Sequence, residues 1–403
     1  MTELIGAVVF CLGFGYSALG RLCVLVPALW RTAPPPAARS NKPPLSVTFL
    51  VPARREHLVI ERAVRSMLSC EHPRVTVVAV VDDAEPDTLK AAERADDGRG
   101  RLLVVADHSR PPSKGRALTA ALSLVDSDVV GVFDADSVVA PRLIEAVQPR
   151  FHAGADVVQT PVHPQWDRAS SWHGLRTLLD YSAWSRTRCG VTRGFVRLSG
   201  TGVFFRVALL KRVGGWRPSL TEDFDLGVRL AAIGARVAVV DHPGVATAED
   251  VPHSAGSLLR QRIRWHQGFM EILASGVWIR LPTTRTRLMA LGPLLIPPAR
   301  VLAVLGAALM AITWLLGGTR LVGPVLITAA GAAGLALGVD CLVFRRISGR
   351  YGVPTTVRQL ATLVWGAVPF YAVSAAASLL AAGREVLGRR TWETTDHGNP
   401  ARQ

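Results

Sequence analysis

Two long apolar regions, one near each end of the chain, limit what it can fold into. Residues 4–30 and most of 288–382 are runs of Leu, Val, Ala, Ile and Gly with few charges. A helix rises about 1.5 Å per residue and the hydrocarbon core of a bilayer is about 30 Å thick, so these runs are long enough to cross a membrane. The segment between them, about 45–280, has the mixed composition of a globular domain. We therefore expect a globular domain enclosed by membrane helices.

Changes in composition predict six regions along the chain. They are an N-terminal transmembrane anchor at 1–32, a Pro-rich linker at 33–45, the globular domain at 46–280, an interfacial segment at 281–300, C-terminal transmembrane helices at 301–383 and a polar tail at 384–403. The C-terminal spans are expected near 301–317, 321–344 and 359–382. A signal peptide is the alternative for the first region, but no positive charge precedes the run and it is longer than usual for such a peptide.

The net charge of +15 comes almost entirely from arginine, since the chain contains only Lys42, Lys90, Lys114 and Lys211 as lysines. A basic balance can indicate nucleic-acid binding. Here many arginines flank the apolar runs, which is typical of the cytoplasmic ends of membrane helices. We therefore expect a multi-pass cell-membrane protein with a cytoplasmic globular domain and no nucleic-acid partner. The five cysteines, which form neither CxxC pairs nor metal-ligand spacing with histidine, are Cys11, Cys23, Cys70, Cys189 and Cys341.

The central segment alternates between apolar, β-rich runs and amphipathic helical runs. The predicted strands are 45–53, 74–83, 101–107, 127–136 and 154–162, and the predicted helices between them are 54–68, 84–97, 114–125 and 140–151. This order predicts an α/β fold with a doubly wound, mostly parallel sheet. Ligands of such sheets bind beyond the carboxyl ends of the strands, where this chain places arginine and acidic residues. Neither a GxGxxG nor a GxxxxGK[ST] motif is present, which argues against dinucleotide and P-loop sites.

Two pairs of aspartates follow predicted strands. Asp134 and Asp136 are separated by one residue, and in an extended segment their side chains point the same way. Their oxygens suit Mg²⁺ or Mn²⁺ and hence a diphosphate substrate, while a turn at the strand end is the structural alternative. Asp82 and Asp83 end another strand and are candidates for accepting hydrogen bonds from a base or a ribose, or for capping the next helix.

Three later stretches carry further candidates. Residues 199–216 are predicted to be glycine-rich and then helical. In the helix predicted at 219–234, Asp223 is a candidate general base, although Glu222, Asp223 and Asp225 would also stabilise the first turn behind a Thr221 cap. The stretch 258–268 contains Q-x-x-R-W; its arginines are candidates for binding a diphosphate and its tryptophan for stacking on a sugar, unless this is an interfacial helix.

These motifs together resemble the membrane-embedded family 2 glycosyltransferases of the GT-A fold, which include cellulose, hyaluronan, chitin and poly-N-acetylglucosamine synthases. The resemblance covers about 46–275 and depends on "VPARRE", "VVDD", "KGRAL", "DAD", "TEDFDL" and "QRIRW", in that order. Arg55 and Thr119 stand where the family more often has asparagine.

The resemblance implies a role for each matching position. Asp223 would be the catalytic base, and Asp134 and Asp136 would hold Mg²⁺ or Mn²⁺. Residues that would bind the donor are Ala53, Glu56, Asp82, Asp83, Lys114 and Asp134, with Ala53 and Glu56 at the nucleoside and Asp83, supported by Asp82, at the uracil. The platform for diphosphate and acceptor would comprise Glu222, Gln261, Arg262, Arg264 and Trp265.

The implied reaction is an inverting transfer of a sugar from a nucleotide-diphosphate sugar, UDP-linked in much of the family, to a glycan hydroxyl. One displacement would give a β-linkage, and the family's polymer-making members repeat it processively. Two alternatives remain: a transferase with a polyprenyl-phosphate or other lipid acceptor, and a non-catalytic membrane-anchored subunit. The Q-x-x-R-W motif argues against the first alternative, and the intact acids at the strand ends argue against the second.

Overall fold

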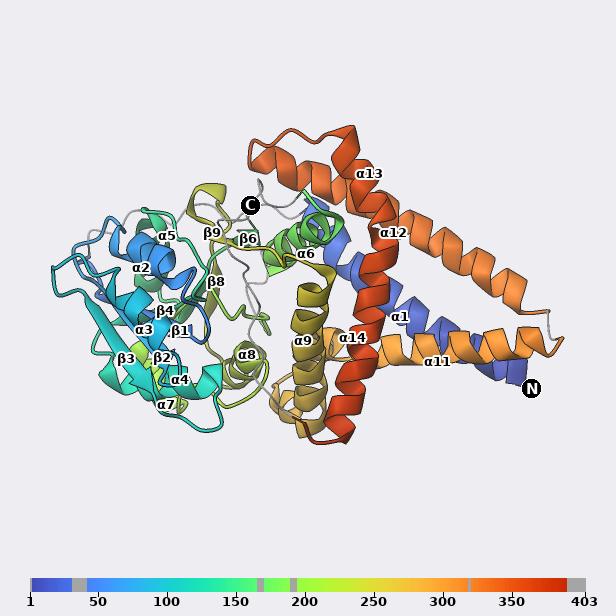
Figure 1. Cartoon of the computed structure of the whole chain (residues 1–403), viewed down its shortest axis with the longest axis horizontal. Helices are drawn as coiled ribbons and strands as arrows, with labels where there is room; N and C mark the ends of the chain where they lie inside the picture. The colour runs from blue at the N-terminus through green and yellow to red at the C-terminus, as the bar shows by residue number, and fades with distance from the viewer. Residues whose placement is uncertain (1, 31–41, 165–169, 189–193, 318–319, 390–403) are drawn as a thin grey trace.

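The computed structural model describes the chain except for residues 1, 31–41, 165–169, 189–193, 318–319 and 390–403. Most of the expected linker, most of the expected polar tail and Cys189 therefore lie outside the described residues. Figure 1 shows an α/β domain on one side and a group of long helices on the other.

A seven-stranded sheet with the order β3-β2-β1-β4-β7-β5-β8 forms the centre of the α/β domain. The strands are β1 Val47–Ala53, β2 Val75–Asp82, β3 Leu102–Asp107, β4 Val129–Val132, β5 Val157–Gln159, β7 Val203–Arg206 and β8 Val237–Val239. Strand β7 runs antiparallel to β4 and β5, while the other neighbouring pairs are parallel. This arrangement confirms the predicted doubly wound, mostly parallel sheet.

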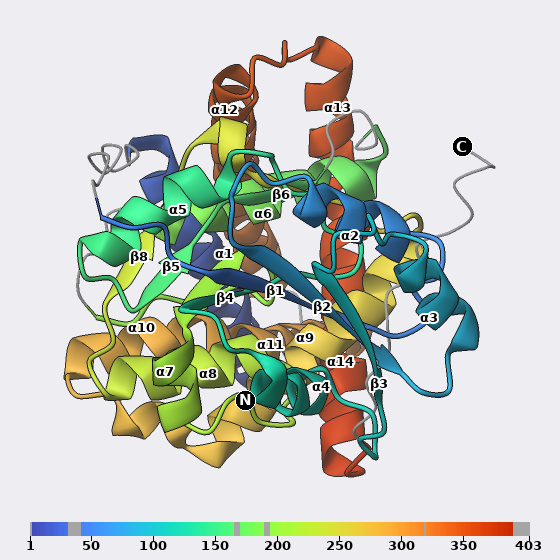
Figure 2. The ribbon, with the colours of Figure 1, turned by 90° about the vertical axis from the view of Figure 1, so that its left-hand side faces the viewer.

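Helices cover both faces of the sheet (Figure 2). Successive side chains of a strand point to opposite faces, so each strand contributes apolar side chains to a core on both faces. Phe49 and Val51 belong to the core on one face, and Leu50 belongs to the core on the other. The first face packs against α2 Ile60–Leu68, α3 Pro86–Glu93 and α5 Leu143–His152; the second packs against α4 Lys114–Ala121, α7 Val207–Arg212 and α8 Glu222–Ala232. Short 3₁₀ turns lie at Leu122–Leu124, Pro243–Val245 and Val277–Arg280.

The segment 199–216 differs from the expectation, because strand β7 precedes the helix there. Phe204 in β7 makes edge-on ring contacts with Phe49 and Phe133, at centroid distances of 6.0 and 5.5 Å. Packing of these rings in the core therefore stabilises β7 as a strand. Its four residues are too few to show the alternation of apolar and polar residues that predicts a strand. A second sheet, parallel and two-stranded, consists of β6 Val162–Pro164 and β9 Thr247–Glu249.

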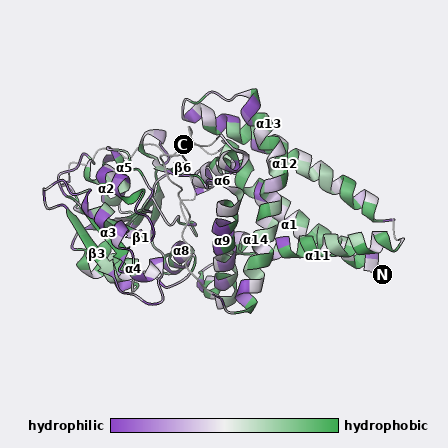
Figure 3. Ribbon diagram, viewed as in Figure 1, coloured by the Kyte–Doolittle hydropathy of each residue, from purple (hydrophilic) through white to green (hydrophobic). Residues whose placement is uncertain are grey.

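The remaining helices surround the α/β domain or extend away from it. They are α1 Thr2–Trp30, α6 Trp172–Arg188, α9 Ala255–Ser275, α10 Thr284–Leu294, α11 Ile296–Leu315, α12 Val322–Arg350, α13 Val357–Trp365 and α14 Ala367–Val386. Among the described residues, four stretches are long and apolar enough to cross a membrane: Thr2–Trp30, Ile296–Leu315, Val322–Arg350 and Val357–Val386. Figure 3 shows their apolar character against the mixed colouring of the α/β domain.

Helix α11 begins at Ile296, earlier than the span expected from 301. Pro297 and Pro298 occupy the first turn of this helix. A proline is tolerated there because the first N–H groups of a helix have no intrahelical partner. Leu295 separates α10 from α11 and lies just before the prolines.

Helices α1 and α11 approach each other through small residues. A Cβ atom at Gly13 would lie 2.3 Å from the backbone nitrogen of Ala303, and one at Gly306 would lie 2.3 Å from that of Phe10. Small residues at such crossings allow two backbones to pack closely, which is a common device between membrane helices.

Replacing Gly306 by alanine is expected to destabilise the protein by about 1–3 kcal/mol, because the added methyl group must push α1 away. Gly331→Ala in α12 is the matched control, since no atom of the described residues lies within 4 Å of its Cβ position. Thermal unfolding in detergent should show a lower melting temperature for Gly306→Ala and little change for Gly331→Ala. Equal melting temperatures for the two variants would contradict the close packing of α1 on α11.

Candidate active site

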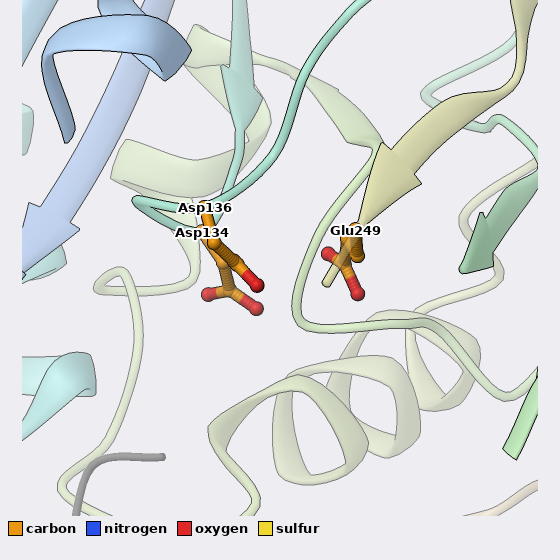
Figure 4. A group of neighbouring side chains, drawn as sticks. All are labelled: Asp134, Asp136 and Glu249. Atoms are coloured by element: carbon orange, nitrogen blue, oxygen red, sulfur yellow. The ribbon is translucent and has the colours of Figure 1, made fainter. Parts of the chain in front are cut away.

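Three carboxylates from two parts of the fold meet at the carboxyl end of β4. Asp134 and Asp136 lie in the loop that follows this strand, and Glu249 ends β9. The loop and β9 are joined by two backbone hydrogen bonds between Val138 and Ala248, of 2.8 and 2.9 Å. As a result, one oxygen from each carboxylate lies within 4.8 Å of the others (Figure 4).

The electrostatics of this acidic cluster favour a cation. Burial, together with the charges of Asp136 and Asp134, holds the pKa of Glu249 well above its ordinary value. Ser137 Oγ donates a hydrogen bond of 3.1 Å to Glu249 Oε1 and orients it. Three converging carboxylates are the oxygen donor set that hard divalent ions such as Mg²⁺ and Mn²⁺ prefer, so these residues fit such an ion.

Lys114, at the start of α4, links the acidic cluster to the start of α8. Its Nζ lies 2.5 Å from Asp134 Oδ1, 2.9 Å from the carbonyl oxygen of Gly200 and 3.4 Å from Glu222 Oε1. Burial alone lowers the pKa of Lys114, but Asp134 and Glu222 outweigh it and raise the pKa above its ordinary value. Lys114 therefore stays positive and keeps the two acidic elements together.

The first turn of α8 presents Glu222 and Asp223. Thr221 is the N-cap residue by position, yet its hydroxyl makes no capping hydrogen bond; Asp223 Oδ1 instead accepts the N–H of Phe224 at 2.8 Å. Burial raises the pKa of Glu222, with Lys114 opposing and Asp223 adding to the rise. Asp225 points elsewhere, since its carboxylate is bound by Arg229 at 2.7 Å.

The Q-x-x-R-W stretch lies on α9 and contacts α6. Gln261 Nε2 donates to the hydroxyl of Tyr181 at 3.4 Å, and the rings of Tyr181 and Trp265 lie 6.0 Å apart. Arg262 binds Asp180 at 3.0 Å, and its guanidinium carbon lies 4.9 Å from the centroid of the Trp265 ring. Arg264 keeps a buried Nε that has no hydrogen-bond partner among the described residues.

Of the residues predicted to bind the nucleoside, Glu56 lines the same cavity as the acidic cluster, whereas Ala53, Asp82 and Asp83 do not. Asp82 forms an ion pair with Arg54 at 3.1 Å, and Asp83 binds His108 at 2.6 Å and also Arg110. Hydrogen bonds from His108 and Arg110 hold the pKa of Asp83 below its ordinary value. Ala53 is buried at the end of β1.

One cavity of about 720 Å³ connects most of the candidate residues, and we call it the chamber. The predicted site residues that line it are Glu56, Lys114, Asp134, Asp136, Glu222, Asp223, Gln261, Arg262, Arg264 and Trp265. Ala53, Asp82 and Asp83 are not among its lining residues. From the α/β domain the chamber continues between α1, α11, α12 and α14, which all contribute to its wall.

Sequence reasoning did not identify several polar residues of the chamber, namely Arg21, Asp180, Tyr181, Arg197, Glu249 and Arg300. Glu249 belongs to a three-residue strand and reaches the cluster only through pairing with a distant loop. Arg21, Asp180, Tyr181 and Arg300 lie on helices whose apolar or mixed composition masks single polar residues, and Arg197 lies in the irregular segment before β7. The isolated arginine within the apolar run of α1 was a usable signal, because a charge inside a membrane helix commonly has a function.

Comparison with known proteins shows which family the α/β domain resembles. The family model for glycosyltransferase like family 2 matches residues 43–268, more than half of the chain. The β-monoglucosyldiacylglycerol synthase of Synechocystis sp. is 31% identical over 252 residues, which is 60% of this chain and 51% of that protein. The poly-β-1,6-N-acetyl-D-glucosamine synthase of Staphylococcus aureus is 23% identical over 246 residues, 59% of this chain and 58% of that protein.

A solved structure covers nearly the whole chain. The mannosyltransferase PcManGT from Pyrobaculum calidifontis, in complex with GDP-Man and Mn²⁺, aligns with a TM-score of 0.66 and 19% identity over 97% of this chain and 100% of that one. This likeness shows the shared fold. The chain spans about half the length of the first curated relatives it matches. The family match over the α/β domain shows that the chain is a family 2 glycosyltransferase with the GT-A fold.

Proposed function

We propose that this enzyme is a metal-dependent, inverting transferase that moves a sugar from a nucleotide-diphosphate sugar, UDP-linked as in much of the family, to an acceptor hydroxyl. The observation that carries the proposal is the single chamber that holds the acidic cluster, Lys114, Asp223 and Arg264. Relatives named as synthases of β-linked products support the stereochemistry, and the neighbouring structure with GDP-Man and Mn²⁺ supports the donor class and the ion.

In this proposal, Asp134, Asp136 and Glu249 hold the ion. A divalent cation there would neutralise the charge that develops on the leaving nucleotide diphosphate. Arg264 has a buried donor available and would bind the same diphosphate. Asp223 would accept the proton of the acceptor hydroxyl, whose oxygen bonds to the anomeric carbon as the bond to the diphosphate breaks and its electron pair leaves with the nucleotide.

The acceptor distinguishes two versions of this function. A glycan hydroxyl is the acceptor that the resemblance to polysaccharide synthases implies, with processive transfer as its extension. The alternative is a lipid acceptor, and the continuation of the chamber between apolar helices favours it. One relative is named as a glucosyldiacylglycerol synthase, which is consistent with a lipid acceptor.

We also propose that the chain is a multi-pass membrane protein with its α/β domain in the cytoplasm, where nucleotide sugars are made. The start of α1 and the α11–α12 connection lie at the same end of the molecule, since Glu3 Oε1 accepts the N–H of Leu321 at 2.7 Å. Both should therefore lie on the opposite side of the membrane from the α/β domain.

Removing a carboxylate of the acidic cluster is expected to weaken ion binding. Asp134→Asn, Asp136→Asn and Glu249→Gln each replace a charged ligand with a neutral amide, and Mn²⁺ affinity should fall by at least about tenfold. Asp126→Asn removes an exposed carboxylate outside the chamber and is the control. Calorimetric titration with Mn²⁺, in the presence and absence of the donor, measures the effect. Unchanged affinity in all three cluster variants would show that these acids have only a structural role.

The base is tested by Asp223→Asn, which keeps the side-chain shape and an oxygen that can accept the N–H of Phe224. Transfer should fall by about 10²–10⁴-fold while donor affinity stays near normal, because only proton removal is lost. Glu222→Gln should cost less, since that side chain lies toward Lys114. Sugar transfer and donor binding are measured side by side. Transfer near the wild-type rate in Asp223→Asn would exclude this residue as the base.

Topology is tested with single cysteines in a chain whose native cysteines are replaced by alanine. Ser123→Cys, exposed on the α/β domain, should react with a membrane-impermeant maleimide only after cells are lysed. Arg320→Cys, exposed near the α11–α12 connection, should react in intact cells. Labelling of residue 123 in intact cells would refute the cytoplasmic placement.

A further inference from the structure

The end of the chamber away from the acidic cluster has an apolar wall. Its lining there includes Phe10, Phe14, Val304, Ala307, Ala336 and Leu337, from α1, α11 and α12. These helices are among those long enough to cross a membrane, and α11 and α12 diverge from one another in Figure 1. The hydroxyl groups of a glycan need hydrogen-bond partners, which such a wall does not offer. A hydrocarbon chain fits it.

A group of buried charged residues lies between this apolar wall and the acidic cluster, and we call it the arginine cluster. It consists of Arg21, Arg176, Arg262, Arg300, Asp180 and Asp340. Arg21 binds both aspartates, Arg262 binds Asp180, and Arg176 binds Asp340. Four guanidinium groups thus share two carboxylates among the described residues, and the cluster has a surplus of positive charge.

Arg300 carries part of this surplus. Its Nη1 lies 3.1 Å from His266 Nε2, and no carboxylate of the described residues forms an ion pair with it. His266 does not repel it, because burial and the charges of Arg300 and Arg262 keep the pKa of His266 well below its ordinary value. His266 and Arg262 are one turn apart on α9, so Arg300 lies beside Arg262.

The surplus positive charge of the arginine cluster is accessible to a ligand in the chamber. Arg21, Arg262 and Arg300 all line the chamber, and Arg262 has a buried Nε that lacks a hydrogen-bond partner among the described residues. A buried donor without a partner is costly, and guanidinium groups bind phosphate oxygens in paired hydrogen bonds. A phosphate is therefore the complementary ligand, next to a wall that suits a hydrocarbon chain.

We propose that the acceptor is a lipid whose headgroup carries both a phosphate and the reacting hydroxyl, an inference that rests on the proposed function. The hydrocarbon chains lie between α11 and α12, the phosphate lies against Arg21, Arg262 and Arg300, and the hydroxyl reaches toward Asp223. In the transfer, the hydroxyl oxygen bonds to the anomeric carbon, its proton goes to Asp223, and the nucleotide diphosphate leaves with the electron pair. The lipid phosphate itself is unchanged.

The test compares two lipids with the same chains, dioleoylphosphatidylglycerol and dioleoylglycerol, by native mass spectrometry of the full chain in neutral detergent. The wild type should retain the phosphate-bearing lipid, and Arg300→Gln should bind it at least about tenfold more weakly, as expected for loss of a charge-assisted hydrogen bond. Arg300→Lys keeps the positive charge and should retain more lipid than Arg300→Gln. Arg285→Gln, which removes an exposed arginine outside the chamber, should bind as the wild type does.

Equal retention of the two lipids, or unchanged retention in Arg300→Gln, overturns the proposal, and so does an equal loss in Arg300→Gln and Arg300→Lys. Glycerol 3-phosphate in solution distinguishes a lipid site from a phosphate site, since competition by it as strong as by the lipid would exclude a role for the chains. This binding test uses neither donor nor metal ion. The proposed function is tested separately, through Mn²⁺-dependent hydrolysis of the donor by the wild type, so either proposal can fail without the other.

Discussion

The buried ion pairs of the arginine cluster fix how the long helices sit on the α/β domain. Arg21 of α1 binds Asp180 of α6 and Asp340 of α12, and Arg262 of α9 and Arg176 of α6 bind the same two aspartates. Burial alone would raise the pKa of Asp180, but Arg21 and Arg262 hold it below its ordinary value, so it stays ionised. Separating these partners would leave charges buried and uncompensated, which is far more costly than losing a surface ion pair.

The same pairs explain why the Q-x-x-R-W stretch serves two parts of the protein. On a helix, residues three and four positions apart share a face, so Gln261, Arg264 and Trp265 lie together. Arg262 and His266 share the adjacent face, which meets Asp180 and Arg300. The segment 261–266 of α9 thus lines the chamber and also contacts Asp180 of α6 and Arg300 of α11. Sequence spacing explained the first face, whereas the partners of the second lie on other helices.

How far the sequence could predict the structure depended on the length of each element. Strands such as Val75–Asp82 are continuous apolar runs, and their acidic ends marked one edge of the sheet in advance. Strands β7, β8 and β9 have three or four residues, too few for a period, and their positions come from tertiary pairing. For the same reason the Asp134–Asp136 pair was found and Glu249 was not. Arg21 and Asp180 are 159 positions apart, so no local pattern relates them.

The chamber carries opposite charges at two places: the acidic cluster is negative, and the arginine cluster is positive. The acidic cluster would repel the diphosphate of a donor, and the proposed cation must reverse that charge before the donor can bind there. The arginine cluster attracts anions without an added ion. A donor that lacked the cation would therefore favour the arginine end, where an acceptor phosphate in place would exclude it. If the proposed acceptor site is correct, charge alone assigns each substrate to its own end of the chamber, and Asp223 and Trp265 lie where the two substrates meet.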